Sequence, residues 1–211
     1  MWMTTDNTTK RLSASNIYPG DILLGYSENT AEEITAQPLG YSHAAIALSN
    51  QQVFEASNTG VRICALHELL DDYDHLAVLT SNHVWEPSKL DRLENFARLQ
   101  SNKSFNMVGM QRVPERRQNH SNEVMERVRN YFDGKYQPQL AERRSYFCSQ
   151  LIVSAFIDAG IITASGSIVD SPDIQSPSDL AINKLYGFFR CYIHRSEKYK
   201  VPETDHFLTW R

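Results

Sequence analysis

The first eighty residues contain short apolar segments separated by turn-forming residues, and this pattern limits the fold most. Apolar runs fall at 22–24, 41–48, 52–57 and 75–80, and the intervening segments are rich in Gly, Pro, Asn and Ser. Short apolar runs bounded by such residues predict strands. The Ser49-Asn50 turn predicts that residues 41–48 and 52–57 pair as a hairpin. The N-terminal part of the chain therefore favours an antiparallel sheet.

The remainder of the chain favours helices. Residues 88–100 form an amphipathic pattern, residues 121–132 form a second one, and residues 148–160 place Leu151, Ile152, Ala155 and Phe156 on one face before Gly160. The polar, charge-rich stretches at 101–120 and 133–145 predict loops, and residues 186–194 predict a late strand. Strands, then helices, then one more strand are typical of an α+β fold with an antiparallel sheet packed against the 148–160 helix.

Composition indicates an ordinary globular chain. Its 211 residues include 41% hydrophobic and 22% charged side chains, which suffices for one core. We expect a flexible lead over residues 1–16 and a single domain over 17–211. The formal net charge of -4 gives no electrostatic reason to expect nucleic acid as a partner.

Three cysteines without a Cys-x-x-Cys pair argue against a disulfide framework and against a cysteine-rich zinc site. His67, His75 and His83 are spaced by eight residues, which matches no helix face or known ligand set, so we expect no metal and no cofactor. The N-terminus lacks the basic and apolar regions of a secretory signal, and no apolar stretch is long enough to cross a membrane. We expect a cytoplasmic product without a transmembrane segment, with signal-independent export left open.

Cys148 stands where the 148–160 helix is predicted to begin. Unpaired N–H groups and the positive end of the helix dipole favour a thiolate at such a position. A nucleophilic thiolate also needs a base and a group that orients the base. His43, at the start of an apolar strand, and Glu55, the one ionisable residue of the adjoining predicted strand, suit these roles. A structural cysteine and a solvent-facing carboxylate are the alternatives.

These segments, in this order, resemble a known family. "PGDILLGYS", "YSHAAIALSNQQVFEAS" and, much later, "YFCSQLIVSAFIDAGI" and "SPSDLA" are similar to the circularly permuted papain-like cysteine hydrolases. That group includes relatives of the NlpC-type cell-wall peptidases, YiiX-like and YebB-like bacterial proteins, and lecithin–retinol acyltransferase. The resemblance covers roughly residues 18–185. It departs from the family at Phe105-Asn106, where many relatives have Tyr-Asp, and residues 107–146 do not align and form a polar insertion.

The resemblance implies a permuted papain-like (NlpC-type) fold and a thioester mechanism with Cys148 as nucleophile, His43 as base and Glu55 as orienting residue. We expect five further residues to contact substrate or support the catalytic residues: Asp21, Tyr41, Ser42, Tyr146 and Ser149. Asp21 should also stabilise the turn before its strand.

The resemblance favours cleavage of an amide bond in a peptide or a peptidoglycan stem peptide. Without a signal sequence, such an enzyme would recycle wall fragments in the cytoplasm or act as an antibacterial effector with an immunity protein as partner. Three alternatives stay open: an acyltransferase, thioesterase or lipid esterase of the same fold, a catalytically silent binding domain, and a metal-dependent hydrolase using His43 and Glu55.

Overall fold

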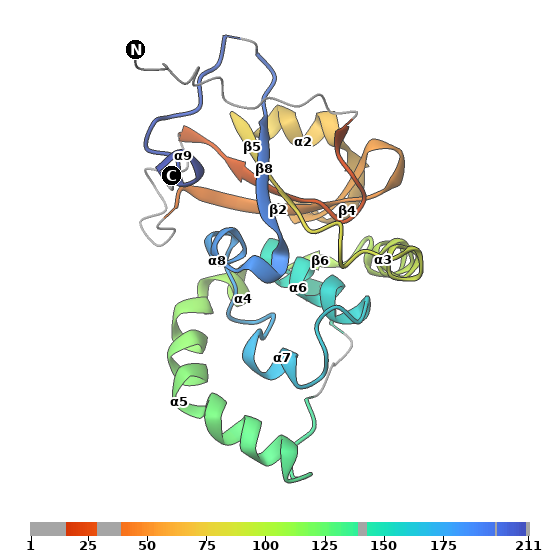
Figure 1. The fold of residues 1–211 in the computed structure, drawn as a ribbon, viewed down its shortest axis with the longest axis vertical. Coiled ribbons are helices and arrows are strands. Elements are labelled where there is room, and N and C mark those ends of the chain that lie inside the picture. Colours follow the sequence, from red (N-terminus) through yellow and green to blue (C-terminus); the bar gives the residue numbers. More distant parts are fainter. Residues whose placement is uncertain (1–15, 29–38, 139–142, 197, 210–211) are drawn as a thin grey trace, which may run out of the picture.

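A computed structural model describes residues 16–28, 39–138, 143–196 and 198–209. The predicted lead over residues 1–16 lies almost entirely outside these ranges, as does most of the polar segment 28–38. A six-stranded antiparallel sheet in the order β4-β3-β2-β1-β5-β8 dominates the upper half of Figure 1. Its strands are β1 Ile22–Tyr26, β2 Tyr41–Ala47, β3 Gln52–Ser57, β4 Gly60–Ala65, β5 His75–Thr80 and β8 Phe188–Ile193. The α+β class and the antiparallel sheet are confirmed.

Helices cover both faces of the sheet (Figure 1). One face carries α2, and the other carries α6, with α3 and α8 beside it. Two very short strands, β6 and β7, pair in parallel below the sheet. The helices are α2 Leu66–Asp72, α3 Pro87–Gln100, α4 Met107–Gln111, α5 Val113–Phe132, α6 Cys148–Asp158, α7 Gly166–Val169, α8 Pro177–Ile182 and α9 His206–Thr209, with single 3-10 turns at Ser49–Gln51 and Lys184–Tyr186; the short strands are β6 Ser104–Phe105 and β7 Ser145–Tyr146.

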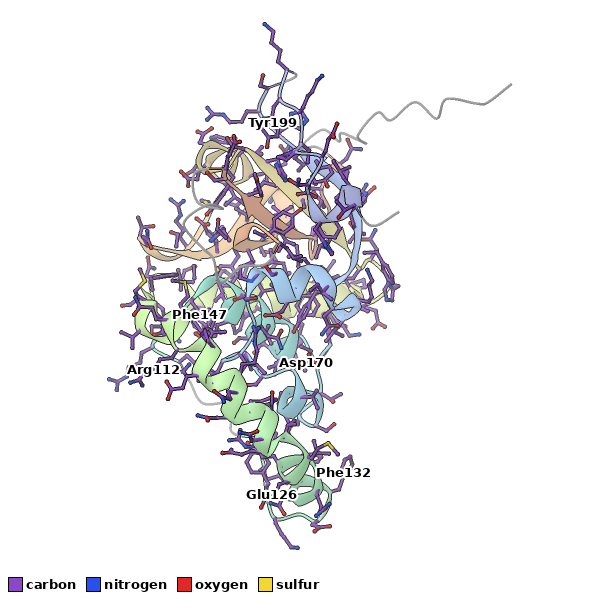
Figure 2. All side chains as sticks on the ribbon, turned by 90° about the vertical axis from the view of Figure 1, so that its left-hand side faces the viewer. Arg112, Glu126, Phe132, Phe147, Asp170 and Tyr199 are labelled. Atoms are coloured by element: carbon purple, nitrogen blue, oxygen red, sulfur yellow. The ribbon has the colours of Figure 1, made fainter. Side chains whose placement is uncertain are left out.

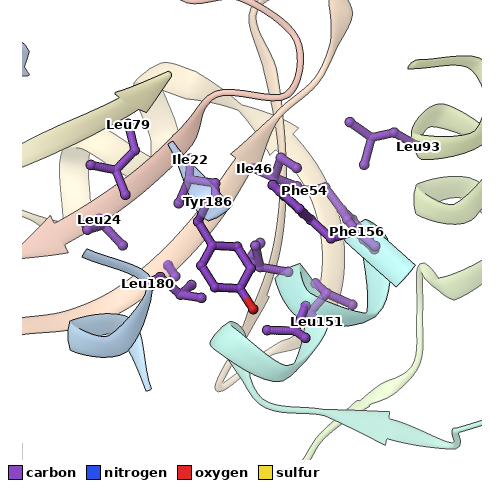
Figure 3. Packing of buried hydrophobic residues seen from close by; sticks show 14 of the residues in the cluster. Ile22, Leu24, Ile46, Phe54, Leu79, Leu93, Leu151, Phe156, Leu180 and Tyr186 are labelled. Carbon is purple, nitrogen blue, oxygen red and sulfur yellow. The ribbon is translucent and has the colours of Figure 1, made fainter. Parts of the chain in front are cut away.

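The larger core lies between the sheet and α6 (Figure 3). Helix α6 is apolar on almost all sides, and Leu151, Ile152 and Phe156 are fully buried. The Phe156 ring meets Trp85 edge-on at 5.1 Å and Tyr186 at 5.2 Å between ring centroids. A helix buried this completely cannot shift without opening cavities, so its first residue is held rigidly.

The expected loop over residues 101–120 is wrong, because α4 and most of the first half of α5 lie there. The predicted start of a helix at Ser121 is wrong for the same reason, since α5 begins eight residues earlier with Pro114 in its first turn. Pro fits the first turn of a helix, where its missing N–H is not needed. Helix α5 projects away from the sheet, and Phe132 lies near its far end (Figure 2).

A buried carboxylate fixes the C-terminal segment to the sheet. Asp205 lies just before α9 and accepts hydrogen bonds from the hydroxyls of Tyr41, at 2.8 Å, and Tyr192. His75 Nε2 lies 3.3 Å from the same carboxylate, and all of these side chains are buried. Burial opposes ionisation of Asp205, but these hydrogen bonds outweigh it and hold its pKa below the ordinary value. The cluster therefore joins β2, β5 and β8 to a segment distant in sequence.

We predict that Asp205→Ala lowers the free energy of unfolding by about 3 kcal/mol or more, because it leaves several buried donors without an acceptor. Urea denaturation followed by circular dichroism measures this effect. Asp133→Ala, which removes an exposed carboxylate paired with Lys135, is the control and should change stability by less than about 0.5 kcal/mol. Equal denaturation midpoints for the two variants would contradict the structural role of Asp205.

Candidate active site

Cys148 is the first residue of α6, as the sequence predicted. Its side chain is 4% exposed and lies where β2 and β3 separate. Those strands pair only between Ala45–Ala47 and Val53–Glu55, so the N–H of Ala44 is free to donate to the Cys148 sulfur, as does the N–H of Ser149. The thiol is therefore surrounded by hydrogen-bond donors although it is almost buried.

His43 and Glu55 meet across the β2–β3 hairpin. Glu55 pairs directly with Ala45, which makes His43 its diagonal neighbour on the same face of the sheet. His43 Nε2 lies 2.7 Å from Glu55 Oε2, and both side chains are buried. This bond leaves the other ring nitrogen of His43 for its hydrogen bond with Cys148. The structure thus brings the three predicted catalytic residues together; their roles stay predictions.

The three groups shift one another's ionisation. Burial disfavours the charged form of His43, but hydrogen bonds to Cys148 and Glu55 outweigh burial and raise its pKa to about 9. Burial likewise would raise the pKa of Cys148, yet its hydrogen bond and Coulombic attraction to His43, with the two backbone N–H groups, hold it below the ordinary value. The site therefore favours the thiolate form of Cys148 beside an imidazolium.

Glu55 has two further partners that the sequence did not indicate. Arg62, directly opposite on β4, donates Nε to Glu55 Oε1 at 2.7 Å. The Cys64 thiol lies 3.8 Å from the same oxygen. Burial works against the charge of Glu55, but His43 and Arg62 hold the pKa of the carboxyl below its ordinary value. Both partners face Glu55 because β3 and β4 pair in register, an antiparallel pairing that the sequence analysis did not predict.

Tyr73 is a second residue that sequence analysis missed. It follows α2, and its ring stacks on the His43 imidazole with centroids 5.4 Å apart and planes 11° from parallel. Gly25, which pairs with His43 on β1, leaves room for that ring. A Cβ atom on Gly25 would lie 2.8 Å from the Tyr73 ring. The ring therefore fixes the plane of the imidazole, and it shields that face of His43 from water.

The supporting residues predicted from sequence lie in different places. Ser42 lines a groove beside Cys148, and Ser149 lines it too while donating its hydroxyl to the Gln175 carbonyl at 2.8 Å. Tyr146 is buried behind α6, where its hydroxyl donates to Gln100. Tyr41 is fully buried in the Asp205 cluster, on the other side of an irregularity in the β1–β2 register.

Asp21 lies at the opposite end of β1 from the strand position that pairs with His43. Its carboxylate accepts from the Tyr18 N–H at 3.0 Å and from the Thr80 hydroxyl at 2.8 Å. The expected stabilisation of the turn is therefore present, and the carboxylate has no contact with Cys148, His43 or Glu55.

The groove beside Cys148 has a volume of about 660 Å³. One wall comes from α4 and the first turns of α5, and the other comes from the start of α8. Its lining comprises Ser42, Met110, Gln111, Val113, Pro114, Arg117, Gln118, Ser121, Phe147, Cys148, Ser149, Gln175, Ser176 and Pro177. The predicted polar insertion thus contributes one wall of a groove that Cys148 also lines.

Ionic contacts fasten that wall to the rest of the site. Asp173 accepts two hydrogen bonds from Arg143, both at 2.9 Å, one from Arg116 of α5 at 3.2 Å and one from Gln150 of α6 at 2.6 Å. Burial opposes the charge of Asp173, but these partners hold its pKa below the ordinary value. Arg116 belongs to the charge-rich stretch that was expected to be a loop, and its bond to Asp173 helps to anchor α5.

Comparison with known proteins found one distant relative that carries a peptidase name. The chain is 28% identical to "Probable lipoprotein peptidase YaeF" of Escherichia coli (strain K12) over 193 residues, which cover 83% of this chain and 67% of that protein. No family model matches the chain, and no solved structure matches it. In the described ranges, no helix is both long and apolar enough to cross a membrane, and no three His, Cys, Asp or Glu side chains are grouped as metal ligands would be.

We predict that iodoacetamide alkylates Cys148 and that the rate falls as pH drops through a pKa lower than that of an ordinary cysteine. Between the lowered pKa of Cys148 and the raised pKa of His43 the thiolate and imidazolium coexist, and the thiolate is lost when pH falls through the lower value. In His43→Ala the titration should move up toward the ordinary cysteine value of about 8.5. Peptide mass spectrometry across pH measures both curves.

In the same experiment, His67→Ala is the control, because His67 is an exposed residue of α2. It should leave the titration of Cys148 unchanged. A titration that is indifferent to His43 would contradict the ion pair.

We predict that Tyr73→Ala raises the apparent pKa of Cys148, whereas Tyr73→Phe leaves it near the wild-type value. The stacked ring, and not its hydroxyl, keeps water from the imidazole and fixes its plane, so the phenylalanine variant retains the effect. The pH dependence of Cys148 alkylation distinguishes the two variants, and Tyr18→Ala on the surface serves as the control. Identical curves for all three variants would exclude a positioning role for Tyr73.

Proposed function

We propose that the protein is a cysteine hydrolase that cleaves an amide bond through a thioester acyl-enzyme. The observation that carries this proposal is the hydrogen-bonded series Cys148–His43–Glu55, with the thiol at the start of a buried helix and in the lining of a groove. A peptidase name on the relative from Escherichia coli supports the same class of reaction.

The first step uses the thiolate–imidazolium pair. The Cys148 sulfur attacks the carbonyl carbon, a C–S bond forms, and the carbonyl oxygen takes the negative charge. The Ser149 N–H in the first turn of α6 and the Ala44 N–H of β2 donate to the sulfur before attack, and in this proposal backbone N–H groups near Cys148 stabilise the oxyanion. His43 then gives its proton to the leaving nitrogen as the C–N bond breaks, and a thioester remains on Cys148.

The second step restores the thiol. Neutral His43 takes a proton from water, the hydroxide attacks the thioester carbon, and the C–S bond breaks to release a carboxylic acid. Glu55 holds His43 through Nε2 in both steps and stabilises its charged form, and Arg62 fixes the carboxylate in turn. The permuted papain-like fold is part of this proposal. A peptidoglycan substrate, secretion as an effector and an immunity partner remain predictions from the resemblance alone.

An intact triad argues against the silent-domain alternative. A binding domain has no need of a buried carboxylate that orients a histidine toward a thiol. Burying such charges costs free energy, and groups with strongly shifted pKa values cluster at functional sites. The site supports no metal-dependent alternative either, since His43 and Glu55 are already bonded to each other and to Cys148 and Arg62.

We predict that p-nitrophenyl acetate leaves an acetyl group on Cys148, seen as a mass increase of the intact protein that hydroxylamine reverses. Cys148→Ala should abolish the adduct, and His43→Ala should lower the acylation rate by roughly a hundredfold to ten-thousandfold, the usual contribution of a general base. His67→Ala should acylate at the wild-type rate. An adduct that persists in Cys148→Ala would contradict the proposed nucleophile.

A further inference from the structure

A second cavity lies on the side of α6 away from Cys148. Its volume of about 330 Å³ falls within the range of roughly 300–1,000 Å³ found for small-molecule sites. Helices α5, α6 and α7 each contribute to its wall, and they lie below the sheet in Figure 1. Helix α6 contributes Ser154, Ile157 and Asp158, which follow Cys148 by about two to three turns, and Ile157 lies on the opposite side of the helix. Among the residues that the structure describes, none lines both this cavity and the groove beside Cys148.

Two polar side chains of the lining have hydrogen-bonding capacity that the described residues leave unused. The Ser154 hydroxyl oxygen is buried and has no partner among them. The Gln100 amide oxygen accepts from Lys103 Nζ at 2.6 Å and from the Tyr146 hydroxyl at 3.1 Å. Because an ammonium group only donates, this contact fixes the orientation of the amide, and its NH2 group has no acceptor in the described ranges. A buried polar group without a partner costs free energy, which a ligand that bonds to it recovers.

Acceptors line the same cavity. The Asp158 carboxylate accepts no hydrogen bond from the described residues, and Arg92 attracts it only through space. Ser171 adds a hydroxyl, which both donates and accepts. The wall therefore offers donors and acceptors together. A ligand whose own groups do both, as hydroxyl groups do, matches this lining, whereas an alkyl chain leaves all of these groups unpaired.

The charges around the cavity are balanced. Its lining contains two cations, Arg127 and Arg143, and two anions, Asp158 and Asp173. Arg143 donates twice to Asp173, both at 2.9 Å, and Arg127 pairs with a carboxylate one turn earlier on α5. An anion would find both arginines already paired, and a cation would meet Asp158 in the field of Arg92. A charged ligand would thus lose hydration without full compensation, so the cavity favours an uncharged one.

Aromatic rings supply part of the apolar wall. Phe96 and Tyr146 meet edge to face, with centroids 6.4 Å apart and planes at 76° to each other. Ile157 and Ile168 also line the cavity. Two rings at nearly a right angle form a corner, which suits a puckered ring whose C–H groups point in several directions. A flat heterocycle stacked on one of these rings would collide with the other.

We propose that this cavity binds an uncharged, polyhydroxylated ring, which is the chemistry of a neutral sugar. The hydroxyl groups of the ligand bond to Ser154, to the Gln100 amide and to Asp158, and its C–H groups pack against Phe96 and Tyr146. This assignment goes beyond the proposed function and does not depend on it, because none of these residues belongs to the triad or lines the groove beside it. The chain thereby gains a ligand site separate from its thiol.

Isothermal titration calorimetry of the whole chain with matched sugars tests the chemistry of the site. The neutral probes are glucose, galactose, mannose and N-acetylglucosamine, and glucosamine and glucuronate carry a positive and a negative charge on the same kind of ring. At least one neutral sugar should bind about tenfold or more tightly than both charged ones, because the cavity offers no unpaired charge to replace lost hydration. Absence of binding by every neutral sugar up to about 10 mM, or tighter binding of a charged one, would overturn the proposal.

Ser154→Ala should weaken binding of the best neutral sugar by roughly tenfold, because it removes a buried hydroxyl that bonds to the ligand and breaks no bond to the described residues. Ser154→Leu fills part of the cavity and should abolish binding. Ser121→Ala is the matched control, because Ser121 lies on α5 in the lining of the other groove, and it should retain the wild-type affinity. Circular dichroism checks that all three variants are folded. Affinity lost in Ser121→Ala but retained in Ser154→Ala would contradict the assignment.

Labelling of Cys148 locates the sugar independently. A sugar in the cavity leaves the thiol accessible, so saturating sugar should not change the rate at which iodoacetamide alkylates Cys148. Protection of Cys148 that persists in Ser154→Ala would place the sugar in the groove and overturn the proposal. Adenosine serves as a flat, uncharged probe in the same titrations. If adenosine bound more tightly than every sugar, the corner between the two aromatic rings would not select a puckered ring, and the sugar assignment would be wrong.

Discussion

The candidate site depends on the register between β2 and β3. Ala45 faces Glu55, so His43 and Glu55 share one face of the sheet and meet at 2.7 Å. A slip of one residue would send either side chain to the opposite face. The same register ends the pairing at Ala45 and frees the Ala44 N–H for the Cys148 sulfur. One hairpin therefore sets both the orientation of the base and part of the environment of the thiol.

The second requirement is that α6 begins where the hairpin opens. Its apolar sides are buried against the sheet, so packing alone fixes the helix along its length. Its first turn is held differently, by polar contacts: Gln150 bonds to Asp173, and Ser149 bonds to the Gln175 carbonyl. Because Asp173 also binds arginines from the neighbouring segments, the position of the thiol is tied to the groove wall.

Sequence patterns predicted the parts of the site that depend on local order. Turn residues and apolar runs located the hairpin, and the apolar period with Gly160 located α6, so Cys148, His43 and Glu55 were identified. The patterns failed where contacts between distant segments determine the secondary structure or the position of a side chain. The charges of residues 112–117 favoured a loop, but Arg116 and Arg117 find carboxylates on distant segments and α5 is continuous through them. The local sequence does not indicate that Tyr73 stacks on His43, because that contact depends on Gly25 of β1, which leaves room for the ring.

Chemistry and selectivity come from different parts of the chain. The sheet and α6 hold the thiol, the imidazole and the carboxylate, to which the proposed function assigns the chemistry. The α4–α5 segment contributes most of the groove wall and no catalytic group. Its Arg117 donates to the Asp179 carboxylate and the Ile174 carbonyl, which attaches the wall to the start of α8. Under the proposed function, replacing this segment would change what reaches Cys148 and leave the triad in place, so substrate choice could vary while the chemistry stays constant.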